Sequence, residues 1–275
     1  MGRELSPQML AAVQELYAAE QQVLAGAFPA SASDLAYGPH ERQRLDLYRS
    51  DCREPAPVII WVHGGGFVRG DKGDATRWPN AHFGRVAARA GYVGVVINYR
   101  LAPDHGWPAG GEDLLAAIQW CRTRAAEHGG DAQRIILAGT SAGAAHVATA
   151  LQLGGGLEGV RGAVLLSGLY GVMPYDDPRD IAYYGADASS HAERAPLEAL
   201  VASAVPLFVA CAEFDPPRFQ SEWLGLLQQR FARHGVLSRN FFGSGHNHFS
   251  LAYHLGSADR RLEDELIEFV QDVTA

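Results

Sequence analysis

"RIILAGTSAGAAHVATAL", residues 134–151, is the stretch that decides how this sequence folds. The apolar run "RIILA" predicts a buried strand, "GTSAG" at 139–143 a tight turn, and "AAHVATAL" a helix. The flanking glycines permit a strained turn that lifts Ser141 out of the sheet, and the start of the helix places free backbone N–H groups beside its hydroxyl. Strand, turn and helix in this order form the context of a nucleophilic serine.

A second glycine-rich stretch, "HGGGFVRG" at residues 63–70, follows the apolar run "VIIWV". An acyl-transfer intermediate develops negative charge on oxygen, and bare backbone N–H groups can stabilise that charge without reorganising. We therefore expect the N–H groups of Gly65, Gly66 and Ala142 to form an oxyanion hole, with His63 anchoring the loop. A dinucleotide-binding loop is the weaker interpretation, because the stretch lacks the GxGxxG spacing and no helix starts immediately after it.

Strand-like and helical segments alternate along the chain, which predicts an α/β fold with a doubly wound, mostly parallel sheet. We expect one domain over residues 1–275, with an N-terminal helix over 6–25 and a cap-like insertion over about 170–204. The helix could pack on the body or form a lid over a pocket, and the pattern leaves both open. The expected strands are "LDLYRS", "VIIWVHG", "YVGVVINYR", "RIILAGTS", "VRGAVLLSG", "PLFVACAEFD" and "RNFFGSG".

The composition excludes several classes of protein. A formal net charge of -8 without a basic stripe argues against a nucleic-acid partner. Cys52, Cys121 and Cys211 show no CxxC spacing, so neither a disulfide framework nor a zinc site is indicated, and no metal or cofactor is expected. The absence of a long apolar run or a signal-peptide pattern favours a cytoplasmic protein without a membrane partner.

With both motifs in place, the chain resembles the α/β-hydrolase superfamily, and more narrowly its HGGG carboxylesterases of the hormone-sensitive-lipase-like group (α/β hydrolase fold-3). "NYRLAPDHGWPAGGEDLLAAIQW", residues 98–120, is similar to the YRLAP segment of that group, and the resemblance extends over nearly the whole chain from Tyr37. It implies an α/β-hydrolase fold with an eight-stranded sheet, helices on both faces, and a serine, an acid and a histidine in that order along the chain.

A serine hydroxyl becomes nucleophilic when an imidazole removes its proton and a carboxylate orients that imidazole. "ACAEFDPPRF" resembles the strand end and Asp-Pro turn of the group, which indicates Asp215 as the acid, with Glu213 as the alternative. "GSGHNHFS" contains two histidines that satisfy the Gly-x-x-His spacing of the group. We favour His248 as the base and assign His246 to the pocket or to the surroundings of the base.

The resemblance implies a serine carboxylesterase that hydrolyses short- to medium-chain acyl esters through an acyl-enzyme intermediate. An arylformamidase-type amidase is one alternative, because the ending "HNHFS" resembles that branch, and a catalytically silent small-molecule receptor is another. By analogy with the group, the partners are a small-molecule ester and, through the final strand or helix, a second copy of the chain. Six aromatic residues suggest an aromatic lining of the substrate site: Trp78, Trp107, Tyr170, Tyr175, Tyr183 and Tyr184.

Overall fold

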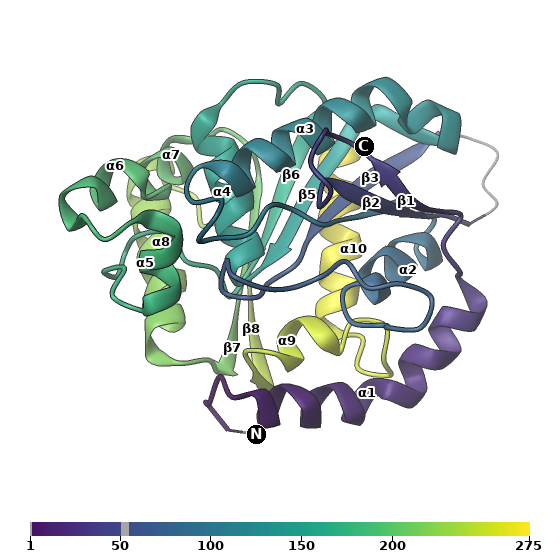
Figure 1. Ribbon diagram of the computed structural model, residues 1–275, viewed down its shortest axis with the longest axis horizontal. Helices are drawn as coiled ribbons and strands as arrows, with labels where there is room; N and C mark the ends of the chain where they lie inside the picture. The colour runs from purple at the N-terminus through teal and green to yellow at the C-terminus, as the bar shows by residue number, and fades with distance from the viewer. Residues whose placement is uncertain (1, 51–54) are drawn as a thin grey trace.

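The computed structural model describes residues 2–50 and 55–275 and contains one eight-stranded sheet (Figure 1). The strand order is β1-β2-β4-β3-β5-β6-β7-β8; β2 runs antiparallel to both of its neighbours, and all other pairs are parallel. The strands are β1 (Ala32–Ala36), β2 (Arg44–Tyr48), β3 (Ala56–Val62), β4 (Val93–Ile97), β5 (Gly130–Thr140), β6 (Val160–Leu166), β7 (Leu207–Phe214) and β8 (Arg239–Asn247).

Both faces of this sheet are covered, and β3 shows why its sequence is apolar throughout. Val58, Ile60 and Val62 pack into one hydrophobic core, whereas Ile59 and Trp61 pack into the core on the opposite face. Because successive side chains of a strand point to opposite faces, a strand between two helical layers must be apolar at every position. The burial of β3 on both faces thus confirms the α/β class that its apolar run predicted.

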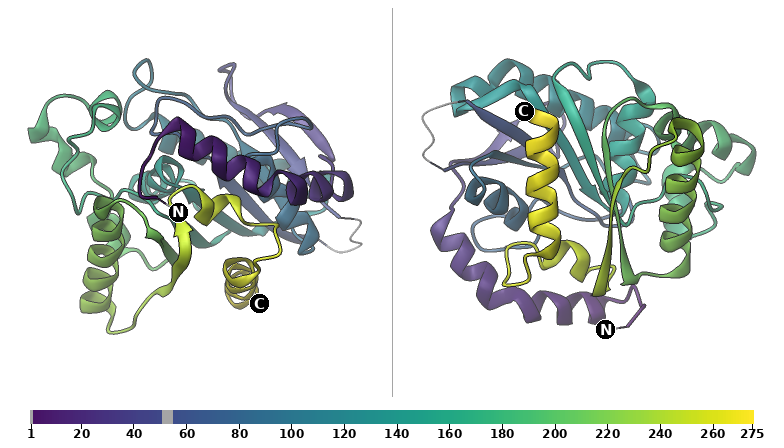
Figure 2. Two further views of the ribbon diagram at one scale, coloured as in Figure 1. Left: turned by 90° about the horizontal axis from the view of Figure 1, so that it is seen from below. Right: turned by 180° about the vertical axis from the view of Figure 1, so that it is seen from behind.

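Helices α3, α4 and α8 contribute to the first core, and α2 and α10 contribute to the second (Figure 2). The connections at the carboxyl ends of the strands carry several short helices. The helices are α1 (Pro7–Ala27), α2 (Ala81–Arg89), α3 (Ala109–Arg124), α4 (Ala142–Leu153), α5 (Pro178–Tyr184), α6 (His191–Arg194), α7 (Leu197–Ala202), α8 (Pro217–His234), α9 (Ser250–Tyr253) and α10 (Arg261–Thr274), with 3₁₀ turns η1 (Ala125–His128) and η2 (Ala188–Ser190).

The sequence patterns missed strand β1. Its five residues, "ASDLA", contain two polar side chains and are mostly exposed, because β1 lies at the edge of the sheet and pairs only with β2. A short edge strand buries too little surface to require the apolar alternation that identifies the other strands. The antiparallel β1–β2 pair therefore extends the sheet beyond the seven strands that the patterns predicted.

Helix α1 begins where its capping residues predict. The Ser6 hydroxyl accepts a hydrogen bond from the Met9 N–H at 3.2 Å, and Pro7 occupies the first turn. Val13 is buried, but Leu16, which helical spacing predicts on the inner face, is 58% exposed. Among the described residues, no helix is long and apolar enough to cross a membrane.

Candidate active site

Ser141 lies at the sharp turn between β5 and α4, in a backbone conformation that is rare for a residue with a side chain. Its φ is 53° and its ψ is -122°. Glycines make this turn compatible with close packing: a Cβ on Gly143 would lie 2.1 Å from the Val62 carbonyl oxygen, and one on Gly139 would lie 2.5 Å from the Gly143 backbone. Neighbouring elements thus hold Ser141 in a strained position that exposes its hydroxyl.

The ends of β7 and β8 bring two further side chains to Ser141. His248 Nε2 lies 3.0 Å from Ser141 Oγ, and His248 Nδ1 lies 2.6 Å from Asp215 Oδ1. An ionised carboxylate only accepts hydrogen bonds, so the proton of the imidazole resides on Nδ1 and Nε2 can accept the serine proton. The structure therefore joins Ser141, His248 and Asp215 in one hydrogen-bonded chain.

The second oxygen of Asp215 is held by donors that the sequence analysis did not identify. Asp215 Oδ2 accepts hydrogen bonds from the Ser167 hydroxyl at 2.6 Å, the Ala212 N–H at 2.7 Å and the Cys211 thiol at 3.3 Å. Burial raises the pKa of Asp215, but His248 and these donors outweigh burial and hold the pKa below its usual value. Asp215 is therefore ionised and fixed in orientation.

Ser167 itself has a signal in the sequence that could have revealed it. Ser167 comes directly after β6. This strand lies between β5, which Ser141 follows, and β7, which Asp215 follows. Like Ser141, Ser167 has a positive φ, 45°, without being a glycine. The ends of β5, β6 and β7 lie side by side in the sheet. A polar residue directly after β6 is therefore expected to face the acid that follows β7.

The glycine loop lies against the serine turn. A Cβ on Gly64 would come within 3.3 Å of Ser141 Cβ, so the loop and the turn are in contact. Gly65 and Gly66 have φ values of 135° and 60°, and within residues 2–50 and 55–275 no protein group accepts a hydrogen bond from either N–H. Ala142 is the first residue of α4, where the N–H has no acceptor within the helix.

His63 anchors this loop without reaching the serine. Its Nδ1 lies 2.7 Å from the Gly64 carbonyl oxygen, and its ring stacks on Tyr99 at 4.3 Å between centroids. Burial lowers the pKa of His63 to about 4, so the imidazole is neutral at pH 7.

The two alternatives that the sequence left open lie elsewhere. Glu213 Oε2 accepts a hydrogen bond from the Gly245 N–H at 2.7 Å, so this carboxylate binds the backbone near the end of β8 instead of bonding to the imidazole. His246 lies 3.2 Å from Ser250 Oγ through Nδ1 and 3.2 Å from Asp259 Oδ2 through Nε2. Both ring nitrogens of His246 therefore face groups other than Ser141.

His246 belongs to a cluster that the sequence spacing did not reveal. His246, His254 and Asp259 place potential metal-ligating atoms within 4.8 Å of one another. The Arg261 guanidinium occupies this cluster: it donates to Asp259 Oδ2 at 2.5 Å and lies 3.4 Å from His246 Nε2. A cation is thus already supplied by the chain, and this cluster fits a role in positioning the β8–α9 turn.

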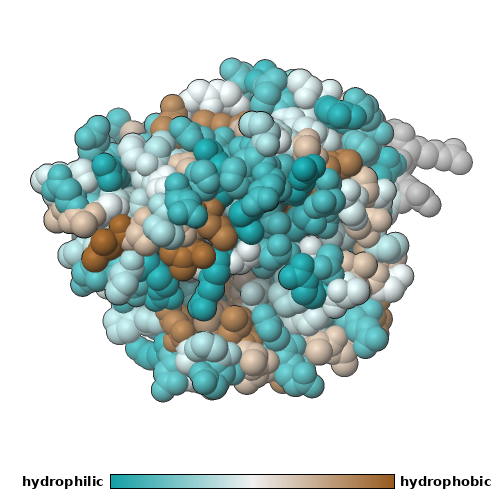
Figure 3. Space-filling view, in the orientation of Figure 1, coloured by the Kyte–Doolittle hydropathy of each residue, from teal (hydrophilic) through white to brown (hydrophobic). Residues whose placement is uncertain are grey.

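Ser141 and His248 open into a cavity of about 470 Å³. Figure 3 shows hydrophilic side chains around a recess below the centre of the face drawn in Figure 1, with hydrophobic ones below it and to its left. Helix α1 packs on α2 and α9, and it also contributes Leu10 and Gln14 to the cavity wall. The N-terminal helix therefore both packs on the body and borders the cavity.

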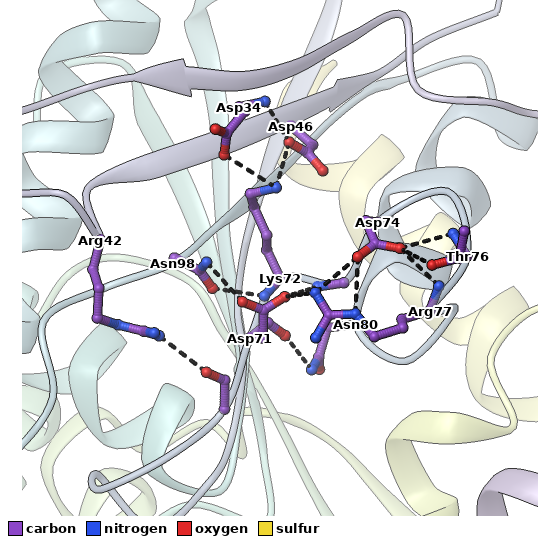
Figure 4. A network of polar contacts seen from close by, with 12 residues as sticks. Asp34, Arg42, Asp46, Asp71, Lys72, Asp74, Thr76, Arg77, Asn80 and Asn98 are labelled. Carbon is purple, nitrogen blue, oxygen red and sulfur yellow. Dashed lines mark hydrogen bonds and ion pairs between the residues drawn. The ribbon is translucent and has the colours of Figure 1, made fainter.

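The segment from Gly70 to Asn80 forms another wall of the cavity, and buried charges hold it in place (Figure 4). Lys72 Nζ lies 2.7 Å from Asp46 Oδ1 and 3.7 Å from Asp34 Oδ1, so the segment is tied to β1 and β2. The Asn98 side chain accepts from the Lys72 N–H at 2.6 Å and donates to Asp71 at 3.0 Å.

The expected aromatic lining is largely wrong. Of the six aromatic residues proposed, only Trp78 lines the cavity among the described residues. Tyr183 stacks on Phe67 at 4.5 Å and Tyr175 on Tyr184 at 3.9 Å, in a buried cluster beside the cavity. Large aromatic rings gain more from complete burial than from a water-filled wall, so these tyrosines hold the 170–204 segment to the body.

Sequence comparisons with known proteins match part of the chain. A family model described as BD-FAE matches residues 45–163. Carboxylesterase NlhH of Mycobacterium tuberculosis (strain ATCC 25618 / H37Rv) is 46% identical over 91 residues, which cover 33% of this chain and 27% of that protein. Esterase LipC of the same strain is 40% identical over 109 residues, covering 39% and 26%. The alignments thus span about a quarter of the length of these curated relatives.

Solved structures are similar over nearly the whole chain. Esterase Est22 superposes with a TM-score of 0.74 at 20% identity and covers 97% of this chain and 89% of that one. EstE1, described as a thermophilic and thermostable carboxylesterase, superposes with a TM-score of 0.72 at 23% identity and covers 98% of both chains. The chain is thus similar in fold to these esterases over nearly its whole length, and similar in sequence to NlhH and LipC over part of it.

Proposed function

We propose that the protein is a serine carboxylesterase that hydrolyses short- to medium-chain acyl esters through an acyl-enzyme intermediate. The observation that carries the proposal is the hydrogen-bonded chain from Asp215 through His248 to Ser141, at the wall of a cavity of about 470 Å³. The names of NlhH, LipC, Est22 and EstE1, all esterases or carboxylesterases, support the same reaction class.

In this proposal Ser141 Oγ attacks the ester carbonyl while His248 Nε2 takes its proton. The N–H groups of Gly65, Gly66 and Ala142 stabilise the charge that develops on the carbonyl oxygen. His248 then returns the proton to the leaving alcohol, and later activates the water that hydrolyses the acyl-enzyme. Asp215 keeps the Nδ1 proton in place and stabilises the imidazolium that forms in both steps.

The proposal also includes a cytoplasmic location. Its support is that Cys121 and Cys211 are buried free thiols, which are typical of a reducing compartment.

The test is turnover of p-nitrophenyl esters from acetate to long acyl chains. Wild-type protein is compared with Ser141→Ala and with Ser190→Ala, which removes a partly exposed hydroxyl that does not line the cavity. We expect turnover that declines for long acyl chains, is retained in Ser190→Ala, and falls in Ser141→Ala by about 10⁴-fold or more. Equal activity of the wild type and Ser141→Ala would refute the nucleophile.

The same assay separates the two alternatives. Faster turnover of N-formylkynurenine than of phenyl acetate by the wild type would favour the formamidase. Stoichiometric binding of either compound without any product would favour the silent receptor.

A further inference from the structure

The cavity that contains Ser141 reverses the charge balance of the chain. The sequence has 23 lysines and arginines against 31 aspartates and glutamates. The cavity wall, by contrast, holds four arginines and two aspartates, and no lysine or glutamate among the described residues. The charged residues of the wall are Arg69, Arg77, Arg179, Arg218, Asp71 and Asp180. An excess of positive charge in a cleft attracts anions even when the whole protein is acidic.

On the side of the 70–80 segment, Arg77 is neutralised. Its guanidinium donates to Asp74 Oδ2 at 2.8 Å and to Asp71 Oδ1 at 3.2 Å, as Figure 4 shows. Two carboxylates therefore occupy the donor groups with which Arg77 could bind an anion.

On the opposite side, the other two arginines are also paired. Arg179 binds both carboxylate oxygens of Asp177, at 2.8 and 2.7 Å. Arg218 donates to Asp180 at 2.5 Å, and the Asp180 side chain is buried. Each of these guanidinium groups already has a carboxylate partner.

Arg69 differs from all three. Within the described part of the chain, its guanidinium has neither a hydrogen bond nor a carboxylate partner. Its backbone is nevertheless fixed, since a Cβ on Gly65 would lie 1.9 Å from the Arg69 carbonyl oxygen. The charge of Arg69 also acts inside the cavity. Burial raises the pKa of Tyr253, another residue of the wall, and the Arg69 charge opposes this rise. Arg69 is thus a fixed position with an uncompensated charge beside the glycine loop.

We infer that Arg69 binds a carboxylate on the substrate, so that the preferred substrates are esters with a carboxylate remote from the ester bond. This inference rests on the proposed esterase function. The planar guanidinium offers two parallel N–H donors that match a carboxylate, and the three paired arginines leave Arg69 as the site for it. Because Arg69 is exposed and its charge is screened, the gain over a neutral substrate is about fivefold. The interaction is made in the ground state and the transition state alike, so it lowers KM and leaves kcat unchanged.

Matched pairs of esters test this inference. 4-Acetoxybenzoate and 4-acetoxybenzamide differ in charge on the alcohol side, and ethyl hydrogen adipate and ethyl adipamate differ in charge on the acyl side. The measured quantity is the ratio of kcat/KM for the anionic ester to that for its neutral partner, in wild type, Arg69→Gln and Arg69→Glu. Arg124→Gln is the matched control, because it removes one exposed arginine charge that lies outside the cavity wall.

We expect at least one pair to show a ratio about fivefold lower in Arg69→Gln than in wild type, through KM, and lower still in Arg69→Glu. Arg124→Gln keeps the wild-type ratio, and 0.5 M salt reduces the wild-type preference. Ratios that are the same in wild type and both Arg69 variants, while the neutral esters are hydrolysed, would overturn the inference and leave the esterase function intact.

A binding measurement separates this failure from failure of the proposed function. Calorimetric titration of the same four esters into Ser141→Ala protein, with and without Arg69→Gln, measures affinity without turnover. Absence of hydrolysis by the wild type would refute the esterase, whereas tighter binding of the anionic ester that depends on Arg69 would still support the anion site. Equal affinities of the anionic and neutral esters would refute it.

Discussion

Two regions of the cavity wall are each held in place by a different kind of interaction. At the ends of β5, β7 and β8, short hydrogen bonds and a strained turn align Ser141, His248 and Asp215. On the other side, the 70–80 segment depends on ion pairs such as Lys72 with Asp46, which neutralise each other. The first arrangement aligns the groups around Ser141, whereas the second pairs opposite charges with each other. Arg69 lies beside the glycine loop, and among the described residues its guanidinium has no such partner. The anion site that we infer thus adjoins the glycine loop rather than the ion-paired segment.

The largest expected effect comes from comparing the two histidines near the end of β8, His246 and His248. His248→Gln should lower kcat/KM for a p-nitrophenyl ester by about 10⁴-fold or more, because no group then accepts the Ser141 proton. His246→Gln should lower it by less than about tenfold, since the ring nitrogens of His246 face Ser250, Asp259 and Arg261 rather than Ser141. Larger loss in His246→Gln than in His248→Gln would reverse the assignment.

A second prediction concerns the ion pair on the opposite side. Lys72→Met leaves the buried Asp46 carboxylate without its cation and should lower the free energy of unfolding by about 3 kcal/mol. Urea denaturation measures this change. The double variant Lys72→Met/Asp46→Asn should recover part of the loss, because the charge that lost its partner is removed. Equal stabilities of the wild type and Lys72→Met would show that the pair does not hold the segment.

A third prediction covers the buried histidines around the cavity and core. Burial lowers the pKa of His63, His82 and His254 to about 4, and that of His146 to about 3, from the ordinary value of 6.5. Between pH 6.5 and 4 the unfolded chain therefore binds protons that the folded chain excludes, so stability falls as the pH falls.

The slope of the free energy of unfolding against pH shows how many histidines contribute. Each one contributes about 1.4 kcal/mol per pH unit within the window. His254→Asn keeps a donor near the position of Nδ1, which lies 2.8 Å from the Ser250 carbonyl oxygen, and should reduce the slope by one proton. Urea denaturation at pH 7, 6 and 5 gives the slope, and stability that is independent of pH over this range would contradict the prediction.

The smallest expected effect concerns the hydrogen bonds that hold the Asp215 carboxylate in place. Ser167→Ala should lower kcat/KM by about fivefold, because it removes one of several donors to Asp215 Oδ2. The loss of that donor also raises the pKa of Asp215, so the loss of activity should grow as the pH falls. Cys211→Ala, which removes a weaker donor to the same oxygen, should have a smaller effect. A uniform loss of activity at all pH values would indicate a merely structural role for Ser167.

Much of the fold and part of the site could be predicted from the sequence. The apolar runs identified seven strands. The turn around Ser141 was identifiable because only glycines fit the close contacts between that turn and its neighbours. Strand β1 was missed because an exposed edge strand needs no apolar pattern. The tyrosines of the 170–204 segment were misplaced because the same residue suits a cavity wall and a buried cluster, and only packing distinguishes the two. The expected homodimer stays a prediction.

The sequence by itself determined the α/β class and the positions of Ser141 and the glycine loop, since each depends on residues adjacent in the chain. Only the tertiary structure placed His248 rather than His246 beside Ser141, brought Ser167 to Asp215, and left the Arg69 guanidinium without a partner among the described residues. These outcomes depend on distances between strand ends and loops that lie far apart in the sequence. Such distances are set by sheet order and core packing, which no local pattern encodes.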